Sequence, residues 1–412
     1  MKKSIVDENA QNFAGKRVLV RVDFNVPQNA DGTVADDSRI RAALPTIDLL
    51  TKAKAKVILV SHLGRPKGAP SSKYSLKPIA DHLRQLLADS TKAVVHFAED
   101  CIGQKAESAV ESMKDGEVTL LENVRFYPEE EKNDSEFSGK LARLADIYVN
   151  DAFGTAHRAH ASTEGITKHI KGAMAGILVA KEMTMLGQAL DNPIKPFATI
   201  IGGAKVSSKI GVLENLLKKV DVLVIGGAMA FSFLRARGLS TGKSLVEEDR
   251  LDYCKELLEK AVAKGVKVIL PVDVVCAAEM KAGVKTTIVD VNAIPDDQIG
   301  LDVGPKTITL IKEALTPCKT ILWNGPLGVF EMEGFEKGTY EIIDLLVELT
   351  TKGTKTIVGG GDSVSALKQK GVPDEALTHV GTGGGATLEY LEGIELPGIA
   401  ALDDKQPATA IK

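Results

Sequence analysis

Four side chains that could do chemistry lie within one short segment, DAFGTAHRAH, which runs from Asp151 to His160. The spacing of His157 and His160 is one that a zinc site with Asp151 or a histidine nucleophile could use. No Glu-Xaa-Xaa-His or His-Glu pattern surrounds them, and Arg158 would repel a dication. Anion binding by Arg158 is the third interpretation, and the surrounding sequence favours it.

Polar and mostly cationic side chains recur where the apolar runs of the first half end. These runs continue into RVDFN, SHLGRP and ENVRF, and the loop DDSRIRA adds further arginines. Because ligands bind beyond the carboxyl ends of parallel strands, these side chains should converge. The residues are Arg21, Asp23, Asn25, Arg39, Arg41, His62, Arg65, Asn123, Arg125 and Arg158. Converging cations repel one another unless an anion fills the site, and the arginine fork suits a carboxylate or a phosphate.

Glycine takes the place of the cations at the strand ends of the second half. The runs GGAK, IGGAMA, NGPLG, GGGDS and GTGGGA each follow an apolar stretch. Glycine lets the main chain approach a ligand closely, and the amides at a helix N-terminus bind phosphate. Lys205 and Lys209 add positive charge, and Asp362 is placed to meet a metal on a polyphosphate. The sequence therefore predicts that the two halves bind two different anions. Binding of two phosphate-bearing ligands by one protein is typical of a phosphotransferase.

Short β-branched runs alternate with helix-like stretches along the whole chain, a pattern typical of βαβ units with buried parallel sheets. The segment from Gly172 to Phe197 divides the two sets and predicts one apolar helix followed by a proline-containing linker. Such a helix between two α/β units is a plausible hinge. The tail after Gly393 predicts either a loose terminus or an arm docked on another domain.

Length and composition predict a two-domain globular protein. The 412 residues exceed what one core usually organises, and 44% hydrophobic with 26% charged residues argue against disorder. A net charge of −4 argues against a nucleic-acid partner. The four cysteines form no CxxC pair, no apolar signal region starts the chain, and no apolar run is long enough to cross a bilayer. We therefore expect a soluble, cytoplasmic protein with no membrane partner.

Two glycine motifs suggest other nucleotide-binding folds. GLSTGKS ends like a P-loop, but Arg237 stands where the Gly-x4-Gly-Lys-Ser spacing requires glycine. GTGGGA at Gly381 fits the dinucleotide fingerprint, although too little chain follows it for a dinucleotide domain. A nucleotide-binding oxidoreductase is therefore the alternative to a kinase, and an inactive binding protein with the same fold is a second one.

Taken together, the longer motifs closely resemble those of phosphoglycerate kinase. They are RVDFNVP, SHLGRP, LLENVRF, VNDAFGTAHRAHAST, GGAKVSSKI, LDVGP, WNGPLGVFE, GGGDS and TGGGATLEYLEG, in family order over residues 17–393. The resemblance implies an α/β fold with two Rossmann-like domains, each with a parallel sheet, joined by a hinge helix. It puts the N-terminal domain at 1–172, the hinge helix and linker at 173–197 and the C-terminal domain at 198–393. A C-terminal arm, 394–412, would return to the N-terminal domain.

The resemblance also implies a reaction and its site. The acyl phosphate of 1,3-bisphosphoglycerate would pass reversibly to ADP bound with Mg²⁺, giving 3-phosphoglycerate and ATP. The residues matched to the 3-phosphoglycerate site are Asp23, Phe24, Asn25, Arg39, His62, Leu63, Gly64, Arg65, Arg125 and Arg158. The residues matched to the nucleotide site are Lys205, Lys209, Gly300, Asn324, Glu331, Gly360, Gly361, Asp362 and Ser363. Glu331 would hold the ribose hydroxyls and Asp362 the metal, and the family expectation is a monomer.

In-line phosphoryl transfer requires positioning and charge stabilisation from the protein. The reacting group of the glycerate is a carboxylate, already anionic at neutral pH, so no histidine is assigned as a general base. We expect Arg39 and Lys205 to neutralise the transferring group and Lys209 to contact nucleotide phosphate. Closure about the segment from Gly172 to Phe197 would precede the chemistry.

Two positions depart from the family pattern. Ser363 stands where family members commonly have threonine, and it keeps the hydroxyl. Ala228 stands where a third glycine is common. Its methyl group would lie near the adenine pocket, where we expect it to affect nucleotide affinity.

Overall fold

The computed structural model describes residues 1–405 and divides into two compact units. Unit 1 comprises Met1–Met183 with Glu395–Lys412, and unit 2 comprises Thr184–Ile394. Helix α5 (Ile177–Asp191) begins in unit 1 and ends in unit 2. The apolar helix expected between Gly172 and Phe197 is therefore present, and its role as a hinge stays a prediction. Residues 406–412 of the expected C-terminal arm lie outside the described residues.

Unit 1 is built on a six-stranded parallel sheet with the order β3-β4-β2-β1-β5-β6. Its strands are β1 (Arg17–Arg21), β2 (Lys56–Val60), β3 (Val95–Ala98), β4 (Val118–Leu121), β5 (Ile147–Asn150) and β6 (Ala173–Ala175). The chain passes from β1 to β2 on one side, whereas β5 lies on the other side of β1. Loops that follow neighbouring strands diverge at such a point, which opens a crevice for a ligand.

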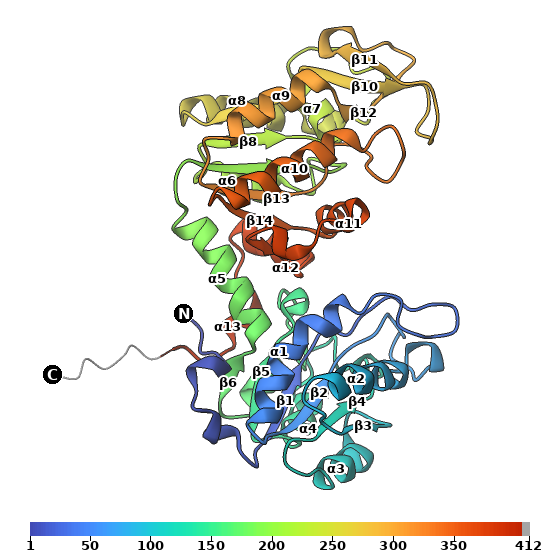
Figure 1. Cartoon of the computed structure of the whole chain (residues 1–412), viewed down its shortest axis with the longest axis vertical. Helices are drawn as coiled ribbons and strands as arrows, with labels where there is room; N and C mark the ends of the chain where they lie inside the picture. Colours follow the sequence, from blue (N-terminus) through green and yellow to red (C-terminus); the bar gives the residue numbers. More distant parts are fainter. Residues whose placement is uncertain (406–412) are drawn as a thin grey trace, which may run out of the picture. The chain divides into compact units, whose positions relative to one another are not determined.

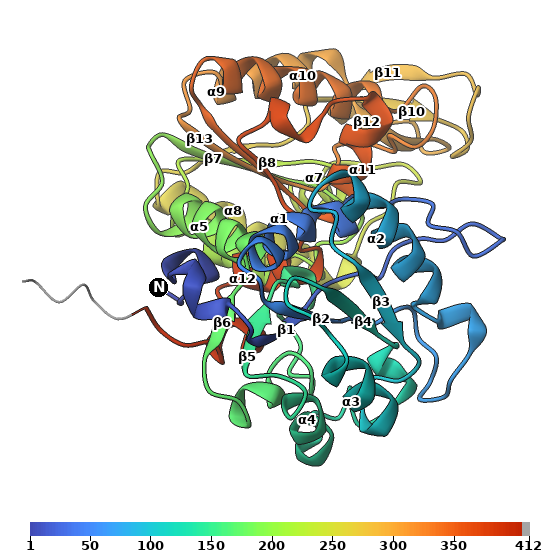
Figure 2. The same ribbon diagram turned by 60° about the horizontal axis from the view of Figure 1, so that its bottom comes forward.

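The helices of unit 1 are amphipathic and cover both faces of this sheet (Figures 1 and 2). They are α1 (Ser38–Lys52), α2 (Lys77–Asp89), α3 (Gly103–Glu111) and α4 (Ser135–Ala142), while the short apolar α13 (Pro397–Ala400) belongs to the C-terminal arm. In α2 the buried residues Ile79, Leu83 and Leu87 recur every four positions, which places them on one stripe. They pack with α1 onto β1, β2 and β4 in one apolar cluster.

The described part of the C-terminal arm is docked on unit 1. The amide of Gly398 donates to the carbonyl of Ala156, and Nδ2 of Asn150 donates to the carbonyl of Gly398. Further along, the amide of Asp403 donates to the carbonyl of Ala173 in β6. Of the two alternatives for the tail, the docked arm is the one found for residues 395–405.

Unit 2 contains a second six-stranded parallel sheet, with the order β15-β14-β13-β7-β8-β9. Its strands are β7 (Phe197–Ile201), β8 (Val222–Ile225), β9 (Lys267–Ile269), β13 (Thr320–Asn324), β14 (Lys355–Gly359) and β15 (His379–Val380). Every residue of β7 and β13 is buried, as expected of strands covered on both faces. The switch point of this sheet lies between β7 and β13.

Seven helices of the described chain cover this sheet: α6 (Ile210–Leu216), α7 (Met229–Ala236), α8 (Leu251–Ala263), α9 (Pro305–Leu315), α10 (Lys337–Thr351), α11 (Gly361–Lys370) and α12 (Gly385–Glu392). Helices α9, α10 and α11 share one apolar cluster with the strands, which includes the buried Trp323. A small three-stranded antiparallel sheet stands beside them, with the order β11-β10-β12. Its strands are β10 (Asp273–Ala277), β11 (Thr287–Asp290) and β12 (Ile299–Val303).

The two parallel sheets with their covering helices confirm the predicted fold class. The antiparallel sheet was not predicted. Among residues 1–405, no helix combines the length and the apolar character needed to span a bilayer.

Candidate active site

The predicted anion-binding residues of unit 1 follow the strands on either side of its switch point. Asp23 and Asn25 follow β1, His62 and Arg65 follow β2, and Arg158 comes after β5. Arg125 lies in the short 3-10 helix Val124–Phe126 that follows β4. The strand order thus brings these loops to one edge of the sheet.

His62 is the buried centre of this edge, with 3% of its surface exposed. Burial lowers its pKa well below the ordinary histidine value, and the positive charges of Arg21, Arg125, Arg158 and Arg39 lower it further. Of these arginines, Arg21 reaches the ring directly, with Nη2 3.1 Å from Nδ1 of His62. The imidazole is consequently neutral at physiological pH.

The loop that carries His62 is fixed by two asparagines. Oδ1 of Asn25 accepts the amide of Gly64 at 2.9 Å. Asn123 is fully buried; its Oδ1 accepts the amide of Leu63 at 3.2 Å and its Nδ2 donates to the Leu63 carbonyl at 2.8 Å. These bonds replace strand pairing beyond the end of β2 and hold the loop in one conformation.

Arg39 lies in the first turn of α1, where its side chain reaches back to the loop after β1. Nη1 donates to the carbonyl of Asn25 at 2.9 Å and lies 3.2 Å from Oδ2 of Asp23. The arginine side chain is 41% exposed, whereas that of Asp23 is 13% exposed. The guanidinium is therefore oriented by two contacts and still has donors open to a ligand.

The other three predicted arginines differ in how firmly they are held. Arg125 is buried, donates from Nη1 to the carbonyl of Gly64 at 2.8 Å and pairs with Glu131 at 3.2 Å. Nε of Arg158 donates to Nε2 of His157 at 3.2 Å, so this histidine orients the arginine. Arg65 is exposed.

Phe24 and Leu63, which the family match also assigned to substrate, have their side chains in the apolar core of unit 1. Only their main-chain groups are left to face a ligand. The amide of Phe24 already donates to Oγ of Ser61, and that of Leu63 to Asn123. Their assignment stays a prediction, and the structure gives them a scaffold position.

In unit 2 the glycines at the strand ends pack main chain against main chain. A Cβ atom on Gly202, after β7, would overlap the carbonyl of Pro326, and one on Gly325, after β13, would overlap the carbonyl of Gly202. The two loops can lie this close only without side chains. These glycines therefore hold the switch point together, in addition to any approach to a ligand.

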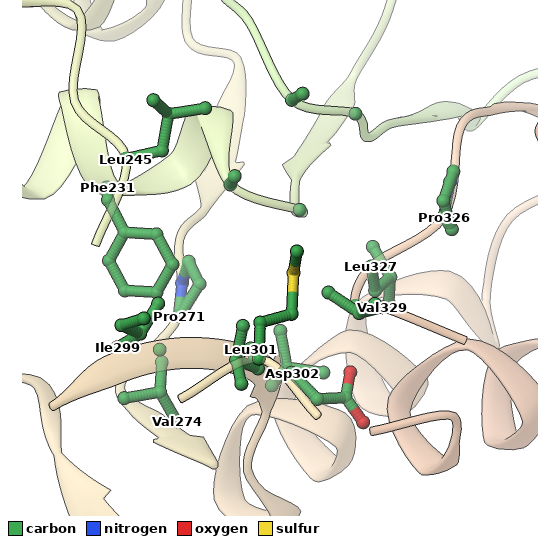
Figure 3. Close-up of a pocket in the computed structure, with 18 of the residues that line it drawn as sticks. Phe231, Leu245, Pro271, Val274, Ile299, Leu301, Asp302, Pro326, Leu327 and Val329 are labelled. Atoms are coloured by element: carbon green, nitrogen blue, oxygen red, sulfur yellow. The ribbon is translucent and has the colours of Figure 1, made fainter. Parts of the chain in front are cut away.

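A cavity of about 550 Å³ opens beside these loops. Figure 3 shows Phe231 and Ile299 on one side of it, with Leu327 and Val329 facing them from the other. The cavity is lined by three predicted residues of the nucleotide site, Gly300, Glu331 and Asp362. Ala228, which differs from the family pattern, also lines it. An apolar slot with a few polar groups at its rim suits a planar base and a sugar.

The two predicted lysines lie on the segment between β7 and α6, whose residues Gly203 and Ala204 line this cavity. Lys209 donates from Nζ to Oδ1 of the buried Asn324. Burial lowers the pKa of Lys209, and the nearby carboxylates of Asp362 and Glu392 oppose that shift. Lys205 is exposed on the loop before α6. The site therefore holds one cation in place and leaves another free to reach a ligand.

The turn from β14 into α11 carries the remaining predicted residues. Gly360 is the N-cap of α11, and Gly361, Asp362 and Ser363 form its first turn. The first amides of an α-helix have no acceptor within it and favour an anion. The hydroxyl of Ser363 is buried and accepts the amide of Gly325 at 2.6 Å, so it braces the neighbouring loop.

A metal site or a histidine nucleophile in DAFGTAHRAH is not favoured by the surroundings of its side chains. Asp151 is buried and its Oδ1 accepts the amides of Leu178 and Val179 at the start of α5. Burial raises its pKa to about 7. Burial also lowers the pKa of His160 to about 4, with help from neighbouring arginines. Within residues 1–405 no group of three or more His, Cys, Asp or Glu side chains is arranged to hold a metal.

Several residues of the site were missed in the assignment from sequence. Arg21 was recognised as a strand-end cation but was not carried into the site, and Glu130 and Ser162 were not considered. All three are buried, and Arg21 connects Ser162 and Glu130 to His62 through hydrogen bonds. In unit 2, Asp302 lines the cavity and its Oδ2 accepts the amide of Gly338 at 2.7 Å. For Arg21 and Asp302 the available signal was a charged residue inside an apolar run, whereas no such signal marks Glu130 or Ser162.

Comparison with known proteins adds to this geometry. The family model described as phosphoglycerate kinase matches residues 8–394. A phosphoglycerate kinase of Synechococcus sp. (strain CC9311) is 55% identical over 403 residues, 98% of this chain and 99% of that protein. The chain belongs to the phosphoglycerate kinase family. The cytosolic phosphoglycerate kinase of Triticum aestivum is likewise 55% identical over 403 residues, with the same coverage of both chains.

A solved phosphoglycerate kinase from Coxiella burnetii has the same fold, with a TM-score of 0.87 at 40% identity over 97% of this chain and 98% of that one. The chain is thus a phosphotransferase with a carboxyl group as acceptor. It transfers a phosphoryl group reversibly between 1,3-bisphosphoglycerate and ADP, giving 3-phosphoglycerate and ATP, a reaction of glycolysis. The oxidoreductase alternative is not favoured.

Proposed function

We propose that unit 1 binds 3-phosphoglycerate through the cations that converge on His62. The observation that carries this assignment is that basic side chains lie at or beyond the ends of β1, β2, β4 and β5 at one sheet edge, where Nη2 of Arg21 lies 3.1 Å from the buried His62. Burial lowers the pKa of His62, and the charges of the arginines lower it further. Packing like charges so closely is unfavourable without an anion. Arg39 and Arg158 retain donors for a carboxylate or a phosphate, and the backbone of the Asn25 and Gly64 loops frames them.

We further propose that unit 2 binds the nucleotide. The base would enter the apolar cavity between Phe231 and Leu327, and Glu331 at its rim would hold the ribose hydroxyls. Lys205, Lys209 and the amides that begin α11 would contact the phosphates.

The site fits Mg²⁺ carried by the nucleotide. Asp362 offers one exposed carboxylate beside the phosphate-binding amides. Mg²⁺ commonly takes one or two protein carboxylates and fills its other positions with water and phosphate oxygens. When bound, it would neutralise phosphate charge.

Arg39 and Lys205 are proposed to stabilise the charge of the transferring phosphoryl group. No proton has to be removed from the glycerate carboxylate at neutral pH, so the chain supplies orientation and positive charge. Turnover requires the two bound substrates to meet, and we propose that α5 carries that movement because it belongs to both units. We also propose that the protein is a monomer and is located in the cytoplasm.

Arg158→Ala should weaken 3-phosphoglycerate binding more than it slows catalysis. Loss of a hydrogen bond to a charged group corresponds to about a tenfold to hundredfold rise in KM for 3-phosphoglycerate. KM for ATP should stay unchanged in initial-rate measurements. Arg143→Ala, which removes an exposed arginine of unit 1, is the control. An unchanged KM in Arg158→Ala would remove this residue from the substrate site.

Asp362→Asn should weaken nucleotide binding only when Mg²⁺ is present. The amide keeps the shape of the side chain but loses the charge that a cation needs. Calorimetric titration of ADP with and without Mg²⁺ checks this, and the wild-type advantage with Mg²⁺ should vanish in the variant. Asp374→Asn removes an exposed carboxylate of the same unit that does not line the cavity. Equal Mg²⁺ dependence in Asp362→Asn and the wild type would contradict the assignment.

A further inference from the structure

A hydrogen-bonded chain of three buried side chains, those of Arg21, Ser162 and Glu130, adjoins His62. Nε of Arg21 donates to Oγ of Ser162 at 2.8 Å, and this hydroxyl in turn donates to Oε1 of Glu130 at 2.6 Å. The amide of Ser162 donates to Oε2 of the same carboxylate at 2.9 Å. Arg21 is 1% exposed, and Ser162 and Glu130 are fully buried. Two opposite charges are thus joined through a serine, out of contact with water.

The chain ends on the histidine that the proposed substrate site uses. Nη2 of Arg21 lies 3.1 Å from Nδ1 of His62, and Nη1 donates to the carbonyl of Val22. A guanidinium has donors only and keeps its charge at every physiological pH. Nδ1 of His62 must therefore accept this hydrogen bond, and the single proton of the neutral ring must sit on Nε2.

We propose that Glu130 and Ser162 are positioning residues, which act through Arg21 to hold His62 as a neutral Nε2–H hydrogen-bond donor. Within residues 1–405 no hydrogen bond is made by Nε2, so this donor is left for a ligand. The role of that donor toward 3-phosphoglycerate rests on the proposed function of unit 1.

Electrostatics explains why the carboxylate of Glu130 is buried here. Three of the cations at this sheet edge, Arg21, Arg125 and Arg158, act on His62 or on one another. Burial raises the pKa of Glu130, while the charges of Arg21 and Arg125 and the two bonds from Ser162 oppose the shift. An arginine buried without a counter-charge would be strongly unfavourable. Glu130 supplies that charge from behind, where it does not compete with an anion in front.

A fixed tautomer benefits recognition of an anion. A histidine with its proton on Nδ1 would present a lone pair from Nε2, which repels carboxylate and phosphate oxygens. A protonated histidine would also donate, but the surrounding arginines disfavour that charge. Holding the Nε2–H form in advance removes the cost of selecting it at binding.

The test is the ¹⁵N NMR spectrum of His62 in the full-length protein without substrate, at neutral pH. One-bond and long-range ¹⁵N–¹H correlations show which ring nitrogen carries the proton. In the wild type, Nδ1 should be unprotonated and Nε2 protonated. A wild-type His62 with its proton on Nδ1, or in an even mixture of tautomers, would overturn the proposal.

Variants then separate positioning from packing. Ser162→Ala removes the bridging hydroxyl and should give a mixture of His62 tautomers, with KM for 3-phosphoglycerate raised about three- to tenfold and KM for ATP unchanged. Ser162→Thr restores the hydroxyl and should recover the single tautomer. Ser138→Ala removes another fully buried serine hydroxyl of unit 1 and should leave the tautomer unchanged. If folded Ser162→Ala kept a single Nε2–H tautomer, Ser162 would not position His62 through Arg21.

Glu130→Gln covers the case in which Ser162→Ala does not fold. The substitution keeps the shape of the side chain and removes its charge, so it too should yield mixed His62 tautomers. An unaltered His62 spectrum would count against the positioning role of Glu130. Adding 3-phosphoglycerate to the wild type tests the separate question of the binding site. If the His62 resonances do not respond, the proposed function of unit 1 fails. The tautomer measured without substrate still tests whether Glu130 and Ser162 position His62.

Discussion

Arg39→Ala is expected to lower kcat by a factor of about 10³–10⁵, with a much smaller change in KM for either substrate. The guanidinium is held by Asp23 and by the carbonyl of Asn25, and its remaining donors are exposed at the site edge. An oriented positive charge that meets the charge developing on a phosphoryl group contributes mainly to the transition state. A steady-state assay that couples ATP and 3-phosphoglycerate consumption to a detectable product measures the effect.

The matched control is Arg41→Ala, which removes an arginine from the same helix. The sequence grouped Arg41 with the converging cations, but its side chain is 60% exposed and pairs with Asp37 at 2.9 Å instead. Its loss should change kcat less than twofold, since exposed ion pairs contribute little. Near-normal turnover in Arg39→Ala would show that this residue does not stabilise the transferring group.

Lys205→Ala is expected to lower kcat by about 10²–10³, the usual effect of removing one preorganised group that stabilises transition-state charge. Lys205 is exposed on the loop before α6, whereas Lys209 on the same loop is held by Asn324. A cation without such a fixed partner can follow the phosphoryl group as it moves. Single-turnover measurements with both substrates saturating isolate this step.

An exposed lysine elsewhere in unit 2 provides the comparison for Lys205. Lys218→Ala removes the same charge away from the cavity and should leave the single-turnover rate unchanged. If both lysine variants lost rate equally, the effect would reflect the net charge of unit 2. If neither lost rate, Lys205 would have no part in the transfer.

Much of the fold could be predicted, and candidate site residues could be named, because parallel sheets impose a simple geometry. A buried parallel strand is a continuous apolar run, and the residues after it lie at the ligand-binding edge. This is why the amino-acid sequence alone allows His62 and Arg158 to be grouped, whereas Arg39 reaches the same edge from the first turn of α1. The same rule placed Asp362 and the lysines at the edge of the second sheet.

Other features depend on packing that a linear pattern does not contain. Glu130 stands in the run PEEEKND, where acidic residues usually face water, yet it is fully buried under Arg21. Ser363 and Phe24 lie at strand ends, but their side chains point into the scaffold. Gly202 and Gly325 suggested phosphate binding, and the structure shows that they also let two loops touch. Each of these depends on which loops become neighbours in space.

The antiparallel sheet illustrates the same limit. Strand β11 (Thr287–Asp290) is largely exposed, so it lacks the apolar run that marked the other strands. Its pairing with β10 supplies the hydrogen bonds that define it. Cavity residues Val274 and Ile299 come from this sheet, which therefore shapes the proposed base pocket.

Separate binding of the two substrates to two variants tests the division of labour between the units most directly. 3-Phosphoglycerate and ADP with Mg²⁺ are each titrated calorimetrically into Arg158→Ala and Asp362→Asn. Arg158→Ala should lose affinity for 3-phosphoglycerate and keep its affinity for ADP, whereas Asp362→Asn should do the reverse. If Arg158→Ala instead lost nucleotide affinity, or Asp362→Asn lost affinity for 3-phosphoglycerate, the assignment of one substrate to each unit would be wrong.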